Sequence, residues 1–397
     1  MTRNTTFSFP RWLILLGLLT ALGPLAIDMY LPAFPAIAQG LVTSPAMVER
    51  TLAGYLLGVG LAQLFYGPMA DRFGRKPPLL LGLAIFIVAS LFCAQADNIQ
   101  DLTLWRIVQA FGGAAGMAIP RAVIRDRFET REAAKALSLL ILIMGVMPIL
   151  APLIGGQILL FSDWRGIFYF MAGSGVLLGL FTIFTMRESL SADRVVPLHP
   201  GIIARNYAGL LRHREFMFYS LAGGLSSAGM FAYISGSPRV FIELFHVEPR
   251  HFGFYFGANA AALILFSQIG ARLLNTYSPG TLLRTAQNLQ ALITVSGAAL
   301  AAFDLMSLPM LMAILIGFMA CQGLVNPNSA ALALSQQGQR LGTASALMGA
   351  MQMLCGSLAG LAVSAWAQVS ALPLTSVLAA CAVLSWLFGR NARANTR

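Results

Sequence analysis

Twelve apolar segments, each long enough to cross a bilayer as a helix, dominate this 397-residue sequence. A hydrocarbon core about 30 Å thick takes roughly 20 residues of helix to cross. The segments are continuously apolar rather than alternating, which argues against a membrane β-barrel. The expected spans are 12–36, 47–70, 77–96, 102–121, 134–161, 166–186, 216–243, 251–274, 281–303, 308–334, 342–368 and 372–389.

The scarcity of charge supports the same fold class. Only 10% of the residues are charged and 57% are apolar, whereas a soluble domain carries about 25% charged residues. So few charges could not cover a soluble surface, which excludes a soluble enzyme, a disordered chain and a disulfide scaffold. The cysteines lie singly within apolar runs, without a partner at metal or redox spacing: Cys93, Cys321, Cys355 and Cys381. We expect no metal and no cofactor.

A polar, basic interruption divides the spans into two groups of six. We therefore expect an all-α polytopic membrane protein with an N-terminal six-helix half at 1–186, a cytoplasmic linker at 187–215 and a C-terminal six-helix half at 216–397. Two such halves are typical of transporters that are built from repeats and bind substrate between them. The first span has no early cleavage site, so we expect it to be retained rather than removed as a signal peptide.

The distribution of cations predicts the orientation. Of 26 Lys and Arg residues, Arg50, Arg165 and Arg250 fall on one side and Arg106 and Arg239 within spans, which leaves 21 on the side of the termini. Cytoplasmic loops carry such an excess. Both termini are therefore expected in the cytoplasm of a bacterial inner membrane. We therefore expect the cations behind the net charge of +11 to set the orientation in the membrane and to contact anionic lipid, not to bind nucleic acid.

Two charges lie within spans of the first half at matching depth. Asp28 is about 24 Å along the first span, roughly 6 Å from the outer edge of the core, and Arg106 lies at a similar depth in the fourth span. A charge in the membrane costs at least about 2.5–3.5 kcal/mol, so we expect the two to pair and to handle a proton. The alternative is that Asp28 sits at the interface and Arg106 extends to the head groups.

Small residues and prolines follow single helical faces in two neighbouring spans. Gly and Pro at intervals of three and four residues permit close helix contact and bend helices. The two faces are Arg106, Gln109, Gly113 and Gly116 in the fourth span, and Gly145, Pro148, Pro152 and Gly155 in the fifth. Packing is the expected role of both.

The loop after the second span carries a specific pattern of glycines and charges. It reads G-x-x-x-D-R-x-G-R-K, with its fixed positions at Gly67, Asp71, Arg72, Gly74, Arg75 and Lys76. This pattern resembles the signature loop of the major facilitator superfamily. The Arg106-x-x-Gln109 stretch resembles the fourth-span motif of that superfamily, although Ala110 replaces the usual Gly. The segment 151–156, which ends in Gly155 and Gly156, resembles the fifth-span motif of its drug:proton antiporters.

The first span and the region between the seventh and eighth spans narrow the resemblance. Residues 27–35, 211–214, 229–231 and 248–253 are similar to the Bcr/CflA drug-efflux family, and the likeness covers nearly the whole chain. It implies export of small drugs, such as bicyclomycin-like compounds, chloramphenicol or sulfonamides, in exchange for protons. It also implies that Asp71, Arg75 and Asp126 latch the outward-open form. The alternative is three solvated loop charges of little energetic worth.

The second half has few charges within spans, Arg239 and Glu243 near the outer end of the seventh. We expect the first half to handle protons and the second mostly to shape the substrate cavity. Neutral polar and aromatic residues within spans are the candidates for binding substrate, with packing as the alternative role. They are Tyr30, Tyr55, Phe231, Tyr233, Asn259, Asn326, Asn328 and Gln352.

These observations predict a monomeric, proton-coupled multidrug exporter of the inner membrane. A metabolite exporter of the same build, for an amino acid such as cysteine or for a sugar, remains the alternative. A membrane enzyme would need a nucleophile with its base or a metal cluster, and the sequence indicates neither. A channel would conduct without exchanging protons, which the charges at Asp28 and Arg106 argue against.

Overall fold

The computed structural model describes residues 11–191, 200–337, 341–366 and 369–394, which form helices and connecting turns with no strand among them. Part of the expected linker at 187–215 lies outside these residues. So do four cations used in the orientation argument, Arg3, Arg194, Arg340 and Arg397.

The helices follow the expected spans closely. The first group is α1 (Arg11–Asp28), the 3₁₀ turn η1 (Leu31–Ala33), α2 (Phe34–Gly40), α3 (Pro45–Phe73), α4 (Lys76–Ala94), α5 (Ile99–Arg127), α6 (Thr130–Phe161) and α7 (Arg165–Thr185). Helix α8 (Pro200–Arg212) lies within the linker. The second group is α9 (Arg214–Pro238), the π-helical turn η3 (Arg239–Leu244), α10 (Pro249–Leu273), α11 (Pro279–Ala302), α12 (Leu308–Leu334), α13 (Leu341–Ser364) and α14 (Leu372–Ala394).

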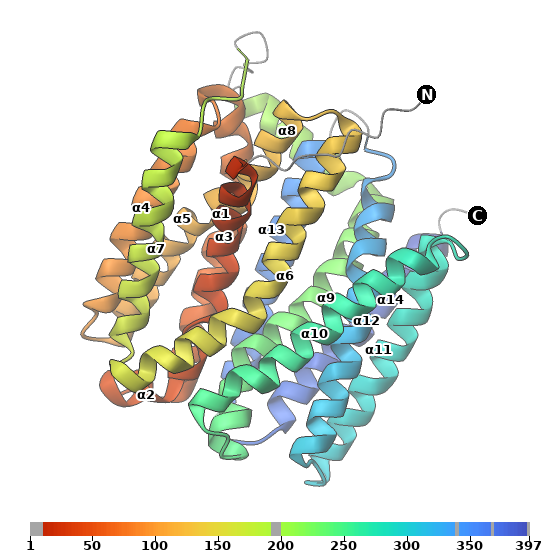
Figure 1. Cartoon of the computed structure of the whole chain (residues 1–397). Coiled ribbons are helices and arrows are strands. Elements are labelled where there is room, and N and C mark those ends of the chain that lie inside the picture. Colours follow the sequence, from red (N-terminus) through yellow and green to blue (C-terminus); the bar gives the residue numbers. More distant parts are fainter. Residues whose placement is uncertain (1–10, 192–199, 338–340, 367–368, 395–397) are drawn as a thin grey trace, which may run out of the picture.

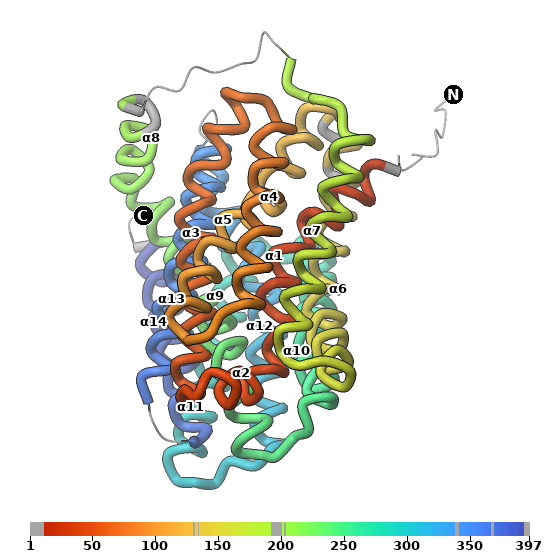
Figure 2. The backbone as a smooth tube through the Cα atoms, turned by 90° about the vertical axis from the view of Figure 1, so that its left-hand side faces the viewer, coloured from red at the N-terminus to blue at the C-terminus, as the bar shows by residue number. Residues whose placement is uncertain are grey.

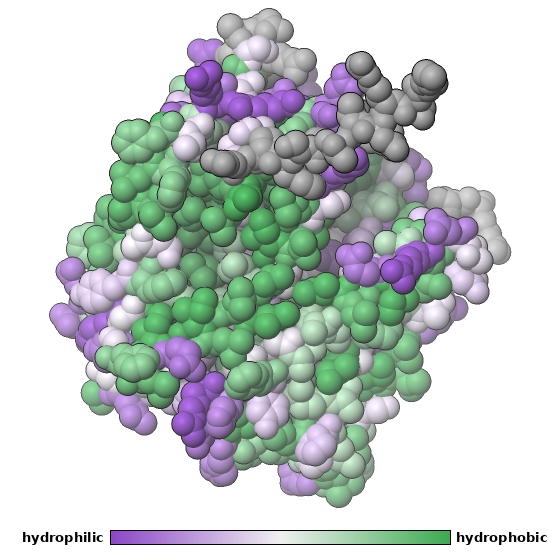
Figure 3. Space-filling view, in the orientation of Figure 1, coloured by the Kyte–Doolittle hydropathy of each residue, from purple (hydrophilic) through white to green (hydrophobic). Residues whose placement is uncertain are grey.

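Most of these helices are apolar enough to cross a membrane. In the described part of the chain, 10 segments meet the length and hydropathy of a span. Helices α9 and α11, at 25 and 24 residues, are equally long but more polar, because α9 is rich in Ser and Gly and α11 carries Arg284, Gln287 and Gln290. On the face seen in Figure 3, a broad apolar belt lies between two polar ends. The expected all-helical membrane architecture is confirmed.

The helices form two groups that meet along two seams (Figure 1). Helix α5 packs on α1, α3 and α4, and α9 packs on α12, α13 and α14. Between the groups, α3 packs against α13 and α6 against α10. The start of α1 and the end of α14 lie toward the end of the bundle that holds α8, called here the α8 end, and α2 lies at the opposite end, called the α2 end.

Glycines set the closest helix approaches around α6. A Cβ on Gly155 would lie 1.8 Å from the carbonyl oxygen of Met29, so only glycine lets α6 approach the end of α1. A Cβ on Gly156 would lie 3.2 Å from the carbonyl oxygen of Pro249 in the other group. These contacts hold the α2 end of the bundle together, as expected for small residues on a helix face.

The linker helix α8 is fastened to the first group by a hydroxyl. Tyr207 Oη donates a hydrogen bond to the carbonyl oxygen of Leu64 in α3, at 3.2 Å. That carbonyl would normally accept from the residue four positions on, which is Pro68 and has no N–H. Figure 2 shows α8 at the margin of the bundle, where it also packs on α9 and α13.

Candidate functional site

Arg106 lies in the core of the first group with no solvent exposure. Its guanidinium carbon is 4.2 Å from the ring centre of Tyr30 and 4.3 Å from that of Tyr55. Nη2 donates to the carbonyl oxygen of Ala26 in α1 at 2.8 Å. Nη1 donates to Oε1 of Gln109, one turn along α5, at 2.5 Å. The cation is therefore held by two aromatic faces and neutral oxygens.

A chain of neutral polar groups continues from Arg106 into α4. Gln109 Nε2 donates to Ser90 Oγ at 2.7 Å, and Ser90 Oγ donates to the carbonyl oxygen of Phe86 at 2.6 Å. Gly113 leaves room for Tyr55, since a Cβ there would lie 2.5 Å from Tyr55 Oη. Gln109 and Gly113, which the spacing placed on the same face of α5 as Arg106, thus position the side chains that surround the guanidinium.

The expected ion pair between Asp28 and Arg106 is not formed in the described structure. The carboxylate of Asp28 is buried, at 2% exposure, and its Oδ1 has no hydrogen-bond partner among the described residues. Arg106 instead binds Ala26, two residues earlier on α1. The guanidinium of Arg106 thus contacts the last turns of α1, but it does not pair with the carboxylate of Asp28.

The charge of Asp28 acts on both groups. It influences the Tyr55 hydroxyl of its own half and the Tyr233 hydroxyl of the other half. Asn259 Nδ2 donates to Tyr233 Oη at 3.1 Å, while Asn259 Oδ1 is buried without a partner in the described structure. Tyr233 also stacks on Phe256, with ring centres 5.3 Å apart. A phenol and an amide of the second half are thus hydrogen-bonded beside an aromatic wall, within electrostatic range of the Asp28 carboxylate.

The other substrate candidates are distributed differently from Tyr233 and Asn259. Tyr30 and Tyr55 are fully buried around Arg106, so the structure places them in the core of the first group. Phe231 packs on α13, where a Cβ on Gly356 would meet its ring at 2.5 Å. The remaining three lie toward α12 and α13: Gln352 donates to Asn326 at 3.0 Å, and Asn328 donates to the Leu324 carbonyl of its own helix at 2.7 Å.

At the α8 end, Arg75 joins two carboxylates of the first group. Its Nη1 contacts Asp71 Oδ1 at 2.6 Å, and its Nε contacts Asp126 Oδ2 at 2.8 Å. These contacts connect the end of α3, the start of α4 and the end of α5. Arg72 is exposed, and nothing lies within 4 Å of a Cβ placed on Gly67. The structure thus brings together the three residues named for the latch, all within the first half.

Glu188, directly after α7, completes this network and was not anticipated from the sequence. Its carboxylate accepts from the backbone N–H groups of Arg75 at 2.9 Å and Lys76 at 3.0 Å, which begin α4. Burial would raise the pKa of Glu188, but the backbone N–H groups of Leu190, Arg75, Lys76 and Ser189 hold this pKa below its ordinary value. Gly74, at φ +87°, leaves no room for a Cβ, which would lie 2.6 Å from Glu188 Oε2.

Lys76 and Ser189 tie the same segment down from either side. Lys76 Nζ donates to the carbonyl oxygen of Ile183 in the last turn of α7 at 2.8 Å, where an unsatisfied carbonyl favours a cation. Ser189 Oγ donates to Asp126 Oδ2 at 3.1 Å. The first residues of the linker are therefore part of the charge network.

At the α2 end, a buried acid and a buried base from opposite halves lie close together, a pairing that was not expected from the sequence. Arg239 Nη1, at the start of η3, lies 3.8 Å from Glu49 Oε1 in α3, and both side chains are almost completely buried. Arg239 Nη1 also donates to the carbonyl oxygen of Trp366 at 2.9 Å. The signal in the sequence was an acidic residue at the third position of the expected span 47–70.

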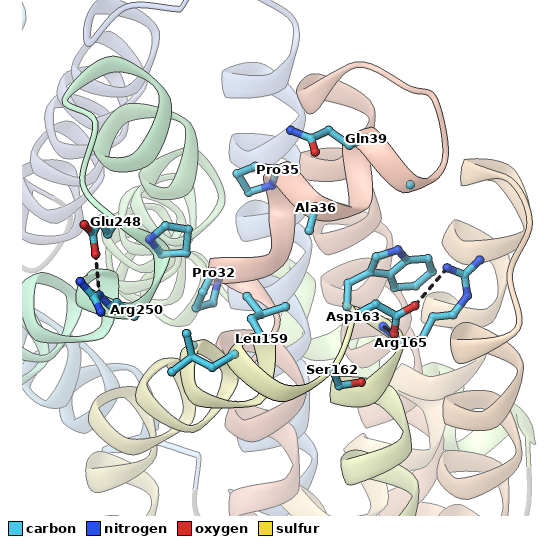
Figure 4. Close-up of a pocket in the computed structure, with 15 residues that line it drawn as sticks. Pro32, Pro35, Ala36, Gln39, Leu159, Ser162, Asp163, Arg165, Glu248 and Arg250 are labelled. Atoms are coloured by element: carbon cyan, nitrogen blue, oxygen red, sulfur yellow. Dashed lines mark hydrogen bonds and ion pairs between the residues drawn. The ribbon is translucent and has the colours of Figure 1, made fainter.

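A hollow of about 960 Å³ also lies at the α2 end, between α2, the end of α6 and the start of α10. Two surface ion pairs flank it, Asp163 with Arg165 and Glu248 with Arg250 (Figure 4). Of the predicted site residues, only Gly156 lines it. The hollow is therefore separate from the carboxylate at Asp28. The described His, Cys, Asp and Glu residues form no group of three that could hold a metal.

Comparison with known proteins gives one consistent result. The family model described as Major Facilitator Superfamily matches residues 16–360. The chain is 37% identical to the uncharacterized MFS-type transporter YdgK of Bacillus subtilis, over 94% of this chain and 93% of that one. It is 33% identical to the bicyclomycin resistance protein homolog of Haemophilus influenzae (97% and 96%) and 34% identical to the multidrug resistance protein MdtL of Klebsiella pneumoniae (94% and 94%).

Solved structures share the fold at lower identity. A bacterial homolog of the human lysosomal transporter Spinster, in an inward-facing and occupied conformation, matches with a TM-score of 0.74 at 19% identity, over 96% of both chains. A D-xylose–proton symporter matches with a TM-score of 0.73 at 14% identity, over 95% of this chain and 97% of that one. These two similarities are evidence for the fold only.

We expect Glu188→Gln to lower the melting temperature at pH 7, because it weakens a cap on α4 worth about 0.5–1 kcal/mol. A carboxylate whose pKa is depressed in the folded state stabilises above its unfolded pKa, about 4.3, and loses this effect as the pH falls through its folded pKa. The difference from wild type should therefore be constant near neutrality and vanish in acid. Thermal unfolding in detergent at several pH values measures this, with Asp97→Asn, at an exposed position between α4 and α5, as control. Equal melting temperatures at pH 7 would contradict the capping role.

Proposed function

Because this chain belongs to the major facilitator superfamily, we propose that it exports small drug molecules across the bacterial inner membrane in exchange for protons. The resemblance drawn from the signature loop is confirmed at the level of the superfamily. Relatives named for bicyclomycin and multidrug resistance, matched over more than nine-tenths of the chain, support drug export rather than export of a metabolite.

The buried carboxylate of Asp28 carries this proposal. It lies between the halves with a free oxygen among the described residues, near the Tyr233 hydroxyl. A carboxylate in that position can hold a proton or interact with a substrate, but not both. Exclusive binding of two ligands at one group is what an exchanger requires, since each ligand shifts the conformational equilibrium only through differential affinity.

Arg106 has a positioning role in this scheme rather than that of a direct ion-pair partner. By donating to the Ala26 carbonyl it fixes the last turn of α1, which carries Asp28. Its positive charge lies in the same low-dielectric core, where electrostatic effects are strong. The second half supplies the wall for substrate: Tyr233, Phe256 and Met312 lie around Asn259. Aromatic and Met side chains suit substrates of varied shape.

Asp28→Asn should abolish proton-driven export while leaving part of the substrate binding, because Asn keeps the shape of Asp but cannot titrate. Arg106→Ala should also fail, and Arg106→Lys should retain part of the activity as a point charge. The measurement is substrate-induced proton movement in reconstituted vesicles, with a panel of drugs as substrates.

The exposed carboxylate Glu248, at the α2 end, gives the matched control, and Glu248→Gln should exchange protons at the wild-type rate. If Asp28→Asn also exchanges protons for drug at that rate, Asp28 is not the coupling residue.

We also propose that the contacts of Arg75 with Asp71 and Asp126 form a latch that biases the conformational equilibrium. The contact with the largely buried Asp126 is charge-assisted and worth about 1.5–3 kcal/mol, whereas Asp71 is 50% exposed and its contact is worth about 0.2–1 kcal/mol. Asp71→Asn should therefore lower export up to about fivefold while the protein inserts normally. Drug efflux from cells that contain matched amounts of protein measures this. Unchanged efflux would favour solvated loop charges with no conformational role.

The excess of cations at the α8 end supports a cytoplasmic location for both termini. A reporter that is active only outside the cytoplasm should be silent when fused to the C-terminus. The same reporter should be active when inserted near Asp97 or Asp304, at the opposite ends of the helices. Activity of the C-terminal fusion would overturn the orientation and, with it, the direction of export.

A further inference from the structure

Glu49 is a fully buried carboxylate at the α2 end that the exchange scheme above does not use. It lies on α3, one turn after Pro45, with no solvent exposure. Around it the halves are in direct contact: Ser357 of α13 donates to the carbonyl oxygen of Ala53 on α3 at 2.8 Å. The α2 end is therefore closed at this level, and Glu49 lies inside the closure.

The hydrogen bonding of Glu49 does not match that of an ordinary buried carboxylate. Neither oxygen accepts a hydrogen bond from the described residues. The nearest cation, Arg239, is 3.8 Å away, beyond hydrogen-bonding distance, and its Nη1 donates to the Trp366 carbonyl instead. An ionised carboxylate without hydrogen bonds is costly in such an environment, whereas the neutral acid is tolerated much better.

Three charged groups act electrostatically on Glu49. Arg239 and the half-buried Glu243 both lie on the π-helical turn η3, and Arg50 follows Glu49 on α3. Arg50 is exposed, with its guanidinium against Met47 Sδ at 3.4 Å, so water screens it. The desolvated part of the cluster is thus two carboxylates and one guanidinium, and one added proton makes it neutral.

We propose that Glu49 is a second proton-binding site, which takes up a proton when the two halves close at the α2 end. When the halves part there, Glu49 meets water and ionises; when they close, it is stripped of water and holds a proton. Proton binding and closure then favour each other, as linkage requires.

The direction of this coupling suits the proposed exchange of drug for protons. The role of Glu49 in export rests on that proposed exchange. A proton captured from outside would favour the form that is closed at the α2 end and open to the cytoplasm, ready to receive a drug. Deprotonation would favour the opposite form. Glu49 would thus act at the point where protons enter, some distance from the carboxylate at Asp28.

The test measures closure directly and needs neither substrate nor transport, so it can fail while drug export stands. Spin labels are placed at Val42→Cys and Leu305→Cys, which are 93% and 61% exposed and lie in different halves. The four native cysteines are replaced, and Asp28→Asn removes the other buried carboxylate. The distance between the labels is then measured in lipid nanodiscs from pH 5 to pH 9.

We expect the short distance to dominate in acid and a longer one to appear as the pH rises. Glu49→Gln should keep the short distance at every pH, and Glu49→Asp should restore the pH dependence. Glu243→Gln leaves Glu49 and Arg239 as a pair without net charge, so it should shift the change in distance to lower pH. A pH response that survives Glu49→Gln, or is absent from the parent, overturns the proposal. A Glu49→Gln variant that shows the long distance also overturns the proposal, because the charged contact between Glu49 and Arg239 would then itself hold the halves together.

Discussion

The guanidinium of Arg106, held between the rings of Tyr30 and Tyr55, is the interaction on which the first half depends. A cation within a membrane costs at least about 2.5–3.5 kcal/mol, and each desolvated ring face offsets about 2 kcal/mol of this. The rings come from the segments on either side of α2, and the cation from α5. The same charge therefore fastens three segments together and sets the position of the α1 turn that carries Asp28. No buried acid is needed to neutralise it, which leaves that carboxylate available for a proton.

Much of this architecture was predictable from the sequence because its causes are local. Apolar runs fix the helices, the spacing of glycines fixes the close face of α6, and a loop pattern brings Asp71, Arg75 and Asp126 together. What could not be predicted depends on rotation about helix axes and on distant partners. Depth along α1 says nothing about the side on which Asp28 lies. Glu49 could not be assigned a buried role until the position of Arg239, 190 residues later in the numbering, was known.

The two halves satisfy buried polar groups in different ways. Where the core of the first half is built around Arg106, the facing helices α9, α11 and α12 of the second half satisfy their buried polar groups with neutral amides and hydroxyls. Ser226 Oγ lies within hydrogen-bonding distance of the amide oxygens of Gln290 and Gln322 and can donate its one hydrogen to either, and Gln322 Nε2 donates to Ser227 Oγ at 3.1 Å. Gln287 Nε2 donates to the Ser385 carbonyl at 2.8 Å. A network of neutral groups does not change its charge with pH, so the second half can present the same wall to substrate whichever protons are bound elsewhere.

The missing N–H of Pro68 has a mechanical consequence. The Leu64 carbonyl instead accepts a hydrogen bond from the hydroxyl of Tyr207, which attaches α8 to the first half. Glu188 and Ser189 attach the beginning of the linker to the same half. A segment that looks like a long tether is thus bonded to the first half at two places, while α8 also packs on α9 and α13 of the second half. Helix α8 therefore bridges the halves, so a rotation of the second half would strain the Tyr207 hydrogen bond as well as His213, the single residue between α8 and α9, whose imidazole caps the first turn of α9.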